Sequence, residues 1–417
     1  MKYDSPDLKK THYVKTFGMS MFPVLHDGDI VYYRRISFSK IRVDDIIVIK
    51  HGRSYMTHRV VYRKKRYVVT KGDNAPMPEL HVTEKQVVGR VYKFKRGNET
   101  ISIDSLYLMQ SSLYFQEILK VKHAFENASI DMIFLKGLPL YLYYQKSHPP
   151  RVYADCDVMI DESDFEKAHS ILTSSGYQYD RQEFSSIHER LRGGKKAEQS
   201  YAKLVGGVPV VFDIHREPVF MISKIGPLTE LYPRRLMEDL RQSFVHTKRK
   251  IRIHNQTFYI LSPVSLIVYL ALHLFNHDFR GAYRYGLLHE IYRKEYAVLR
   301  EPFIMQIDRE IETYKLAGFV SLPFLLLRKY YGNPMPKSIR RFTKLKHRYL
   351  SNRYDQLSRG GIFYSDTQIG GGIQRFINLV MLSPEPWWRR MMILVNIRVH
   401  AMIMWILFYS VKKRLSL

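Results

Sequence analysis

The sequence contains almost no cysteine and is short of acidic residues. Cys156 is the single cysteine among 417 residues, which excludes an intrachain disulfide framework and any zinc site built from cysteine ligands. Asp and Glu total 39 against 66 Lys and Arg, so the formal net charge is +27. No apolar run precedes Gly18, so we expect no secretory signal and a cytoplasmic, reducing location.

The positive charge is concentrated toward the two ends of the chain. Residues 1–104 have a net charge of +10, residues 105–326 of +3, and residues 327–417 of +14. A basic tail of this kind is typical of contact with a phosphate-rich partner, although a merely solvated surface is the alternative. Among such partners we favour an anionic membrane surface over nucleic acid.

One apolar segment near the C-terminus approaches the length of a membrane span. Residues 391–409 are long enough, but Asn396, Arg398 and His400 fall near the centre, where polar groups are costly in hydrocarbon. We therefore predict a buried helix or a helix lying on the membrane surface, with the protein cytoplasmic and peripheral to the membrane. The alternative is a membrane anchor formed by residues 391–409.

Hydrophobic patterning in residues 1–104 predicts a small all-β domain. Short β-branched runs alternate there with Gly, Asp and Asn turn signals, a spacing typical of a small barrel or sandwich. The expected strands are Asp29–Tyr33, Asp45–Ile49, Arg59–Tyr62, Tyr67–Thr70 and Val87–Phe94.

The periodicity changes after Asp104. Residues 105–330 combine a helical pattern at 106–127 with short apolar strands, which indicates an α+β domain, and its second half, from Ser262 onward, is helical. The expected strands are Phe134–Leu135, Val158–Ile160 and Val208–Ile214. Residues 331–417 are predicted to form a basic, partly helical tail with a glycine-rich interruption at 360–372. The predicted fold class is therefore multidomain: an all-β domain, an α+β domain and a basic tail.

The first domain contains the residue types of a serine hydrolase. Ser20 closely follows Gly18, so a turn can expose its hydroxyl and leave backbone N–H groups available to an oxyanion. A serine hydroxyl needs a base, which His58 could supply, and Asp73 could hold the imidazole in the required tautomer. The types alone carry little weight, because each is also an ordinary turn or strand residue.

The sequence around these residues is more specific. Ser20–Pro23 (SMFP), His58–Val60 (HRV) and Thr70–Asn74 (TKGDN) flank strands that begin with Gly-Asp or Asp-Asp pairs. Residues 15–95 thereby resemble the signal peptidase I superfamily, in particular its endoplasmic-reticulum and archaeal-type branch, which uses a Ser-His-Asp triad.

This resemblance implies Ser20 as the nucleophile, His58 as the general base and Asp73 as the acid that orients it. Two departures bear on the assignment. Such peptidases normally have a transmembrane helix just before the serine box, whereas 19 largely polar residues precede Ser20 here. Some members also have a further acid beyond the TKGD box, for which Glu79 is the nearest candidate.

The second domain contains three aspartates in a pattern typical of metal binding. On a strand, Asp155 and Asp157 would project to the same face, where the two carboxylates repel unless a cation lies between them. Mg²⁺ (or Mn²⁺) binds a few carboxylates together with substrate phosphates. Asp213, on another strand, could complete a two-metal site for phosphoryl displacement. Surface acids on an edge strand are the alternative.

Basic and glycine residues near these acids could contact a triphosphate. Lys136 and Gly137 follow an apolar strand and precede a helix, so they would offer a cation and free N–H groups, and Arg151 could assist.

Four segments resemble one known enzyme superfamily. They are Leu135–Gly137 (LKG), Arg151–Asp157 (R-x3-D-x-D), Ala168–Tyr177 and Phe212–His215. Together they resemble nucleotidyltransferases of the DNA polymerase β type, specifically the uncharacterised nucleotidyltransferases, over residues 105–330. The resemblance implies a Mg²⁺- or Mn²⁺-dependent reaction with a nucleoside triphosphate as substrate. Its helical half extends to His289, which replaces a family aspartate.

Three further residues have two interpretations each. His188 and His215 could contact substrate or be hydrogen-bonded structural histidines. Cys156 lies between the two aspartates, so it should point to the opposite, buried face, where a reactive role is not expected.

The combined resemblance predicts a bifunctional enzyme. No candidate membrane span separates Asp73 from Lys136, so both sites should share one compartment. The peptidase would act on a peptide or protein partner, and the transferase would move a nucleotidyl group from a nucleoside triphosphate to a peptide, protein or small molecule, as in peptide maturation. The alternative is a transferase alone, with the peptidase-like domain as a non-catalytic peptide-binding module.

Overall fold

The computed structural model describes most of the chain, and the statements below refer to these residues. They are 12–152, 154–179, 197–218, 228–253, 255–344, 348–365, 368–401 and 403–404. The predicted substrate histidine His188 and residues 405–409 of the apolar C-terminal segment lie outside them.

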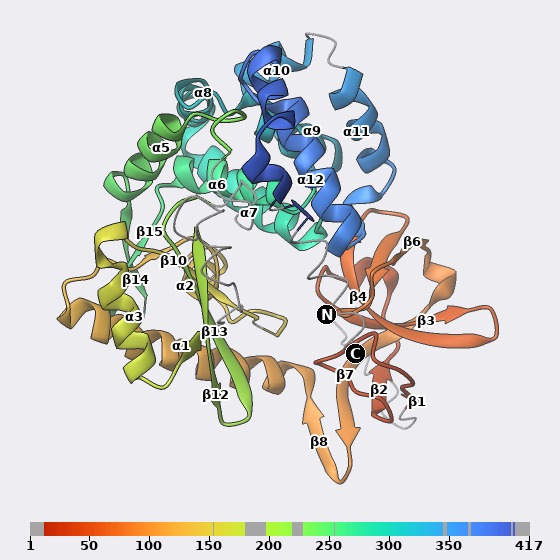
Figure 1. The fold of residues 1–417 in the computed structure, drawn as a ribbon. Coiled ribbons are helices and arrows are strands. Elements are labelled where there is room, and N and C mark those ends of the chain that lie inside the picture. The colour runs from red at the N-terminus through yellow and green to blue at the C-terminus, as the bar shows by residue number, and fades with distance from the viewer. Residues whose placement is uncertain are drawn as a thin grey trace.

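The first domain is one twisted antiparallel sheet, seen at the right of Figure 1. Its strand order is β1-β2-β7-β3-β4-β5-β6, and β8 pairs with β7. The strands are β1 (His12–Lys15), β2 (Ile30–Arg34), β3 (Ile46–His51), β4 (Ser54–Arg63), β5 (Val68–Lys71), β6 (Pro78–Val82), β7 (Val87–Arg96) and β8 (Glu99–Ser102). All five strands expected from the sequence are present. Val31, Val48 and Phe94 are fully buried in its core, as alternation of apolar and polar residues requires.

The long helix α1 (Ile103–Asn127) leaves this sheet and runs beneath the second one. It begins where the Ser102 hydroxyl accepts the N–H of Ser105, an N-cap that fixes the start of the helix. Tyr114, Ile118 and Phe125 recur at helical spacing and are completely buried, so they pack the helix onto the second domain.

The second sheet has the order β11-β12-β13-β10-β9-β15-β14. Its strands are β9 (Ile133–Phe134), β10 (Cys156–Met159), β11 (Gln178–Tyr179), β12 (Glu198–Val205), β13 (Val208–His215), β14 (Arg249–Ile253) and β15 (Gln256–Ile260). The short helices α2 (Leu138–Gln145) and α3 (Phe165–Ser174) connect them. Strands β10 and β13 run parallel in the centre, and this pairing positions the aspartates described below.

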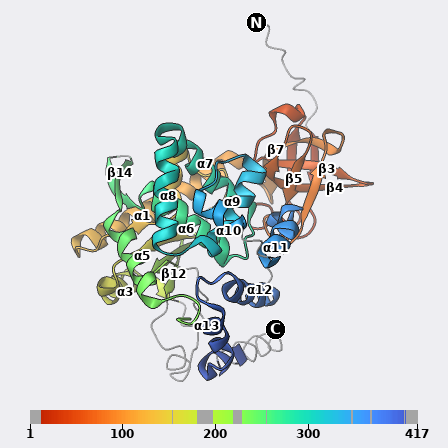
Figure 2. The same ribbon diagram turned by 90° about the horizontal axis from the view of Figure 1, so that it is seen from above.

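Helices make up the remainder and pack on one another (Figure 2). They are α5 (Arg234–His246), α6 (Pro263–Asn276), α7 (Ala282–Leu299), α8 (Glu301–Thr313), α9 (Ala317–Tyr331), α10 (Lys337–Lys344), α11 (Arg348–Ser358), α12 (Gln368–Leu382) and α13 (Trp387–Met391). The all-β domain followed by an α+β region with a helical second half confirms the predicted fold class.

Two predictions for the tail need correction. The glycine-rich interruption is shorter than expected, because the backbone of α12 is already helical from Gln368 and includes Gly370–Gly372. The apolar segment is not one helix: α13 ends at Met391, a 3₁₀ turn occupies Met392–Leu394, and helical backbone resumes only after Asn396. In the part of the chain that the structure describes, no helix combines the length and the hydrophobicity needed to cross a bilayer.

Tyr62 joins the first domain to the helices of the second. Its side chain is only 3% exposed, and its hydroxyl donates to the carbonyl oxygen of Tyr330 at 2.9 Å. The ring packs against the rings of Tyr330, Tyr331 and Phe363. Tyr62 therefore belongs to the hydrophobic core of the second domain although strand β4 belongs to the first.

Arg59, three residues earlier on β4, makes the polar half of the interface. Its guanidinium forms a two-bond ion pair with Asp73, both bonds at 2.7 Å, and is itself almost fully buried. It also donates to the hydroxyl of Tyr107 on α1 and to the carbonyl oxygen of Pro150. Because all these acceptors are satisfied by one buried cation, the two domains are held in a fixed relative position.

Truncating Tyr62 tests how strongly the domains are joined. We expect Tyr62→Ala to destabilise the chain by about 3–5 kcal/mol, because a fully buried ring is lost from a tightly packed interface. Tyr62→Phe should cost only about 1 kcal/mol, since it removes the hydrogen bond alone. Urea unfolding followed by circular dichroism measures both, and equal effects of the two variants would contradict the packing described.

Candidate active sites

Ser20 and His58 are brought together in the first domain. The Nε2 atom of His58 lies 3.2 Å from the Ser20 hydroxyl oxygen, within reach for a base–nucleophile pair. Strand β4 supplies His58, and the loop between β1 and β2 supplies Ser20. The carbonyl oxygen of Ser20 accepts the N–H of Asn74 at 2.8 Å, which holds the serine loop against the β5–β6 turn.

Glu79, and not Asp73, is the acid that contacts His58. An oxygen of Glu79 lies 2.7 Å from His58 Nδ1 and also accepts the hydroxyl of Thr70 at 2.8 Å. Asp73 is instead occupied by Arg59, whose side chain leaves β4 on the face opposite to His58. The geometry therefore places Glu79, and not Asp73, beside His58, and Asp73 pairs with the buried arginine of the domain interface.

Gly72 closes one side of this pair. A Cβ atom at this position would lie 2.5 Å from the Ser20 carbonyl oxygen and 3.0 Å from His58 Nε2, so only glycine permits the close approach. Within the described residues the backbone N–H groups of Ser20 and Met21 donate no hydrogen bond, which leaves them available to an oxyanion.

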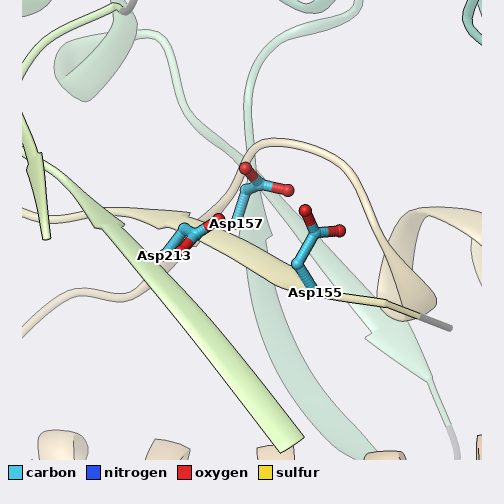
Figure 3. A group of neighbouring side chains, drawn as sticks. All are labelled: Asp155, Asp157 and Asp213. Atoms are coloured by element: carbon cyan, nitrogen blue, oxygen red, sulfur yellow. The ribbon is translucent and has the colours of Figure 1, made fainter. Parts of the chain in front are cut away.

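The three predicted aspartates converge in the second domain (Figure 3). One oxygen from each of Asp155, Asp157 and Asp213 lies within 4.8 Å of the others. The parallel pairing of β10 and β13 places Asp157 directly beside Asp213, and Asp155 immediately precedes β10. Ser200 on β12 donates its hydroxyl to Asp213 at 2.6 Å and so fixes that carboxylate.

Lys136 and His215 set the charge of this cluster. Burial, and then repulsion by Asp157, raise the pKa of Asp155, and burial raises the pKa of Asp213. Burial acts in the same direction on Asp157, but Lys136 and His215 outweigh it and hold that pKa at about 2. Asp157 is thus firmly ionised, whereas Asp155 and Asp213 are costly to ionise beside it. A divalent cation that binds oxygen ligands would offset the repulsion between these carboxylates.

Lys136 and Gly137 form the predicted strand-to-helix turn. Lys136 Nζ lies 2.9 Å from Asp157 and 3.9 Å from Asp155, so the cation faces the carboxylates directly. Gly137 has a φ of 106° and immediately precedes α2, a backbone geometry that favours glycine. The N-terminus of α2 therefore follows directly on Lys136, whose Nζ contacts the aspartates.

The remaining residues singled out in this domain have structural partners. His215 is buried, with Nε2 3.1 Å from Asp157 and Nδ1 3.6 Å from Glu198, so it supports the cluster. Cys156 is fully buried on the other face, as predicted, and burial raises the pKa of its thiol. His289 lies 2.7 Å from the amide oxygen of Asn333.

A cavity of about 710 Å³ lies between the two domains and reaches the aspartate cluster. The second domain contributes Lys136, Gly137, Arg151 and Asp155, together with α7 residues such as Arg284. The first domain contributes residues of the β2–β3 connection and of strands β4 and β5. The volume of the cavity is in the range typical of small-molecule sites.

Local sequence patterns do not indicate several of these contacts. Glu79 was predicted only as a candidate further acid, without a partner. Arg59, Glu198 and Ser200 each contact a partner distant in the chain, which strand pairing brings close. Alternation along β4 was the one usable signal, because it places His58 and Arg59 on opposite faces.

The chain belongs to the family described as uncharacterised nucleotidyltransferase, whose profile matches residues 105–332, more than half of the sequence. Residues 2–92 match the Peptidase S24-like family. That family is related to signal peptidase I but is not the same family, so the predicted assignment is correct only at the level of a peptidase-like domain. Both are enzyme families. No curated protein and no solved structure matches the chain.

The geometry predicts that Glu79 and Asp73 differ in their effect on Ser20. We expect Glu79→Gln to reduce the rate of Ser20 labelling by a fluorophosphonate probe by about 10- to 100-fold, because His58 loses the carboxylate that orients it. Asp73→Asn should lower the stability of the chain but leave the labelling rate of the folded protein within a few-fold. Ser20→Ala provides the background, and a larger loss with Asp73→Asn than with Glu79→Gln would contradict the assignment.

Proposed function

We propose that the second domain is a metal-dependent nucleotidyltransferase that transfers a nucleotidyl group from a nucleoside triphosphate to an acceptor. The convergence of Asp155, Asp157 and Asp213 beside Lys136, at one end of the interdomain cavity, carries this proposal. The three carboxylates are the hard oxygen ligands that Mg²⁺ or Mn²⁺ prefers. When bound, the metal would neutralise phosphate charge and orient the reacting oxygens.

The protein's own residues would bind and orient the triphosphate. Lys136 and Arg284 supply positive charge next to the aspartates, and the N-terminus of α2 supplies N–H groups. His215 keeps Asp157 ionised, and Ser200 fixes Asp213. In the reaction an acceptor oxygen forms a bond to the α-phosphorus, the bond to pyrophosphate breaks, and the acceptor loses its proton.

For the first domain we propose serine peptidase activity. The hydrogen-bonded series from Ser20 through His58 to Glu79 supports it, and exposed apolar side chains next to Ser20, those of Met19 and Phe22, suit a peptide with apolar residues. Because the two domains pack as one unit, a peptide held by the first domain is a natural acceptor for the second.

The alternative is that the first domain only binds the peptide, in which case Ser20→Ala would leave both peptide binding and nucleotidyl transfer intact.

Substitution in the aspartate cluster tests the transferase. With α-labelled nucleoside triphosphates and Mg²⁺ or Mn²⁺, we expect Asp155→Asn and Asp157→Asn each to reduce label transfer to the protein or to co-purifying peptide on the order of 100-fold or more. Both variants should also lose Mn²⁺ binding, which electron paramagnetic resonance measures. Asp161→Asn is the matched control, since Asp161 follows the same strand but lies outside the cluster. Nucleotidyl transfer that persists in both cluster variants would contradict the proposal.

We also propose that the C-terminal surface formed by residues 387–397 binds an anionic membrane. Trp387, Trp388 and Ile397 are 74%, 58% and 83% exposed, and arginines accompany them in a region of the chain with few acids. Large exposed apolar patches mark interaction sites, and tryptophan with arginine suits a lipid interface.

Vesicle co-sedimentation of the full chain tests this surface. We expect binding to phosphatidylglycerol vesicles but not to phosphatidylcholine vesicles, and at least a ten-fold loss in the double variant Trp387→Ala, Trp388→Ala. Val298→Ala, which truncates an exposed apolar residue on α7, should bind normally. Unchanged sedimentation of the double variant would disprove the assignment.

A further inference from the structure

The end of the cavity that the first domain forms has its own chemistry. Asp44 and Val43, from the β2–β3 connection, lie there together with Tyr141, Tyr283 and Tyr331 of the second domain. Tyr283 lines the same cavity as both Asp44 and Asp155. A ligand with its phosphates at Asp155 could therefore extend along Tyr283 toward Asp44.

Asp44 is an acid without a partner in this wall. Among the described residues its carboxylate makes no hydrogen bond and no ion pair, whereas Asp73 is paired with Arg59, Glu290 with Arg293, and Asp155 with Lys136. Burial raises the pKa of Asp44, against the opposing charges of Arg151 and Arg59, and the residue is only half-buried. Its carboxylate can therefore accept hydrogen bonds from a ligand that enters the cavity.

The backbone holds Asp44 in position on both sides. Its φ is 74°, in the left-handed region that few residues other than glycine adopt. Its N–H donates to the carbonyl oxygen of Val60, and its carbonyl oxygen accepts from Arg59. Unusual backbone conformations held in place by surrounding bonds are concentrated at binding sites.

Aromatic rings line the same cavity as Asp44. Tyr283 is 37% exposed, and the guanidinium of Arg151 lies 3.9 Å from the centre of its ring. Tyr141 and Tyr331 are also lining residues, and the charge of Asp44 raises the pKa of both after the larger effect of burial. Tyrosine rings and arginine planes are the surfaces on which nucleobases stack.

We infer that this end of the cavity binds the nucleobase of the triphosphate and that Asp44 selects guanine. The inference rests on the transferase function proposed above and adds the identity of its nucleotide. An ionised carboxylate only accepts hydrogen bonds. Guanine offers it two adjacent donors, N1–H and the 2-amino group. Adenine and cytosine place a ring-nitrogen acceptor beside their single amino group, and uracil places carbonyl oxygens on both sides of its one N–H.

Calorimetric titration of the full chain tests the inference. The probes are non-hydrolysable α,β-methylene analogues of GTP, ATP, CTP and UTP with Mg²⁺. We expect the GTP analogue to bind at least about ten-fold more tightly than the others, because hydrogen bonds to a charged group are lost with the other bases. The inosine analogue, which lacks the 2-amino group, should have an intermediate affinity.

Substitution at Asp44 separates base recognition from phosphate binding. Asp44→Asn should weaken binding of the GTP analogue by about 10- to 100-fold and leave the ATP analogue within a few-fold. Asparagine tolerates the left-handed conformation, so the fold should be retained. Asp45→Asn is the matched control, because Asp45 is occupied by the N–H of Arg42 and lies near Arg90.

The outcomes distinguish this inference from the proposed function. Equal affinities for all four analogues, or a preference for GTP that survives Asp44→Asn, would overturn the guanine assignment. If binding is nevertheless lost in Asp155→Asn, the transferase proposal stands without it. Absence of binding by any analogue would overturn both. An Asp44 that binds a cationic group of the acceptor instead would leave all nucleotide affinities unchanged in Asp44→Asn, which also contradicts the inference.

Discussion

The contact between strand β4 and the second domain is the constraint on which both candidate sites depend. The guanidinium of Arg59 is buried against α1 and the carbonyl oxygen of Pro150. Three residues later, the ring of Tyr62 is buried against the end of α9. A buried cation with a single carboxylate partner is strongly destabilising once that partner is lost, so the geometry is defined narrowly. His58 lies beside Arg59 on the same strand, and Arg59 also lines the interdomain cavity.

The charge distribution within the cavity follows from this arrangement. Most lining cations belong to the second domain, among them Arg151 and Arg284. The first domain adds Arg59 and Lys71 together with Asp44, whose carboxylate makes no ion pair within the described part of the chain. Positive charge near the aspartate cluster suits the polyanionic part of a nucleotide, and an acceptor-only group at the other end suits a base with N–H donors. The proposed nucleotide site therefore combines residues of both domains.

Local patterns in the sequence predicted the elements and part of each site. Alternation identified the strands that hold His58 and Asp157, and helical spacing identified α1. The two aspartates flanking Cys156 converge with Asp213 because neighbouring parallel strands place equivalent positions side by side. Such relations extend over a few residues or one strand pair, so sequence spacing encodes them.

The rest depended on pairings that local patterns do not encode. Asp73 lies next to the serine box in space and has the expected residue type, yet Arg59 occupies it, and Glu79 reaches His58 only through the pairing of β5 with β6. The cavity is lined by residues as distant as Asp44 and Tyr364, and no short segment contains enough of it to be recognised.

Photoaffinity labelling would test the central claim, that a nucleotide binds between the two domains, most directly. The full chain would be irradiated with 8-azido analogues of GTP and ATP in the presence and absence of Mg²⁺, and the labelled peptides would be identified by mass spectrometry. We expect metal-dependent labelling of peptides from both domains, including the region of Asp44 and the region of Tyr283. Labelling confined to one domain, or labelling outside the cavity that does not depend on the metal, would contradict it.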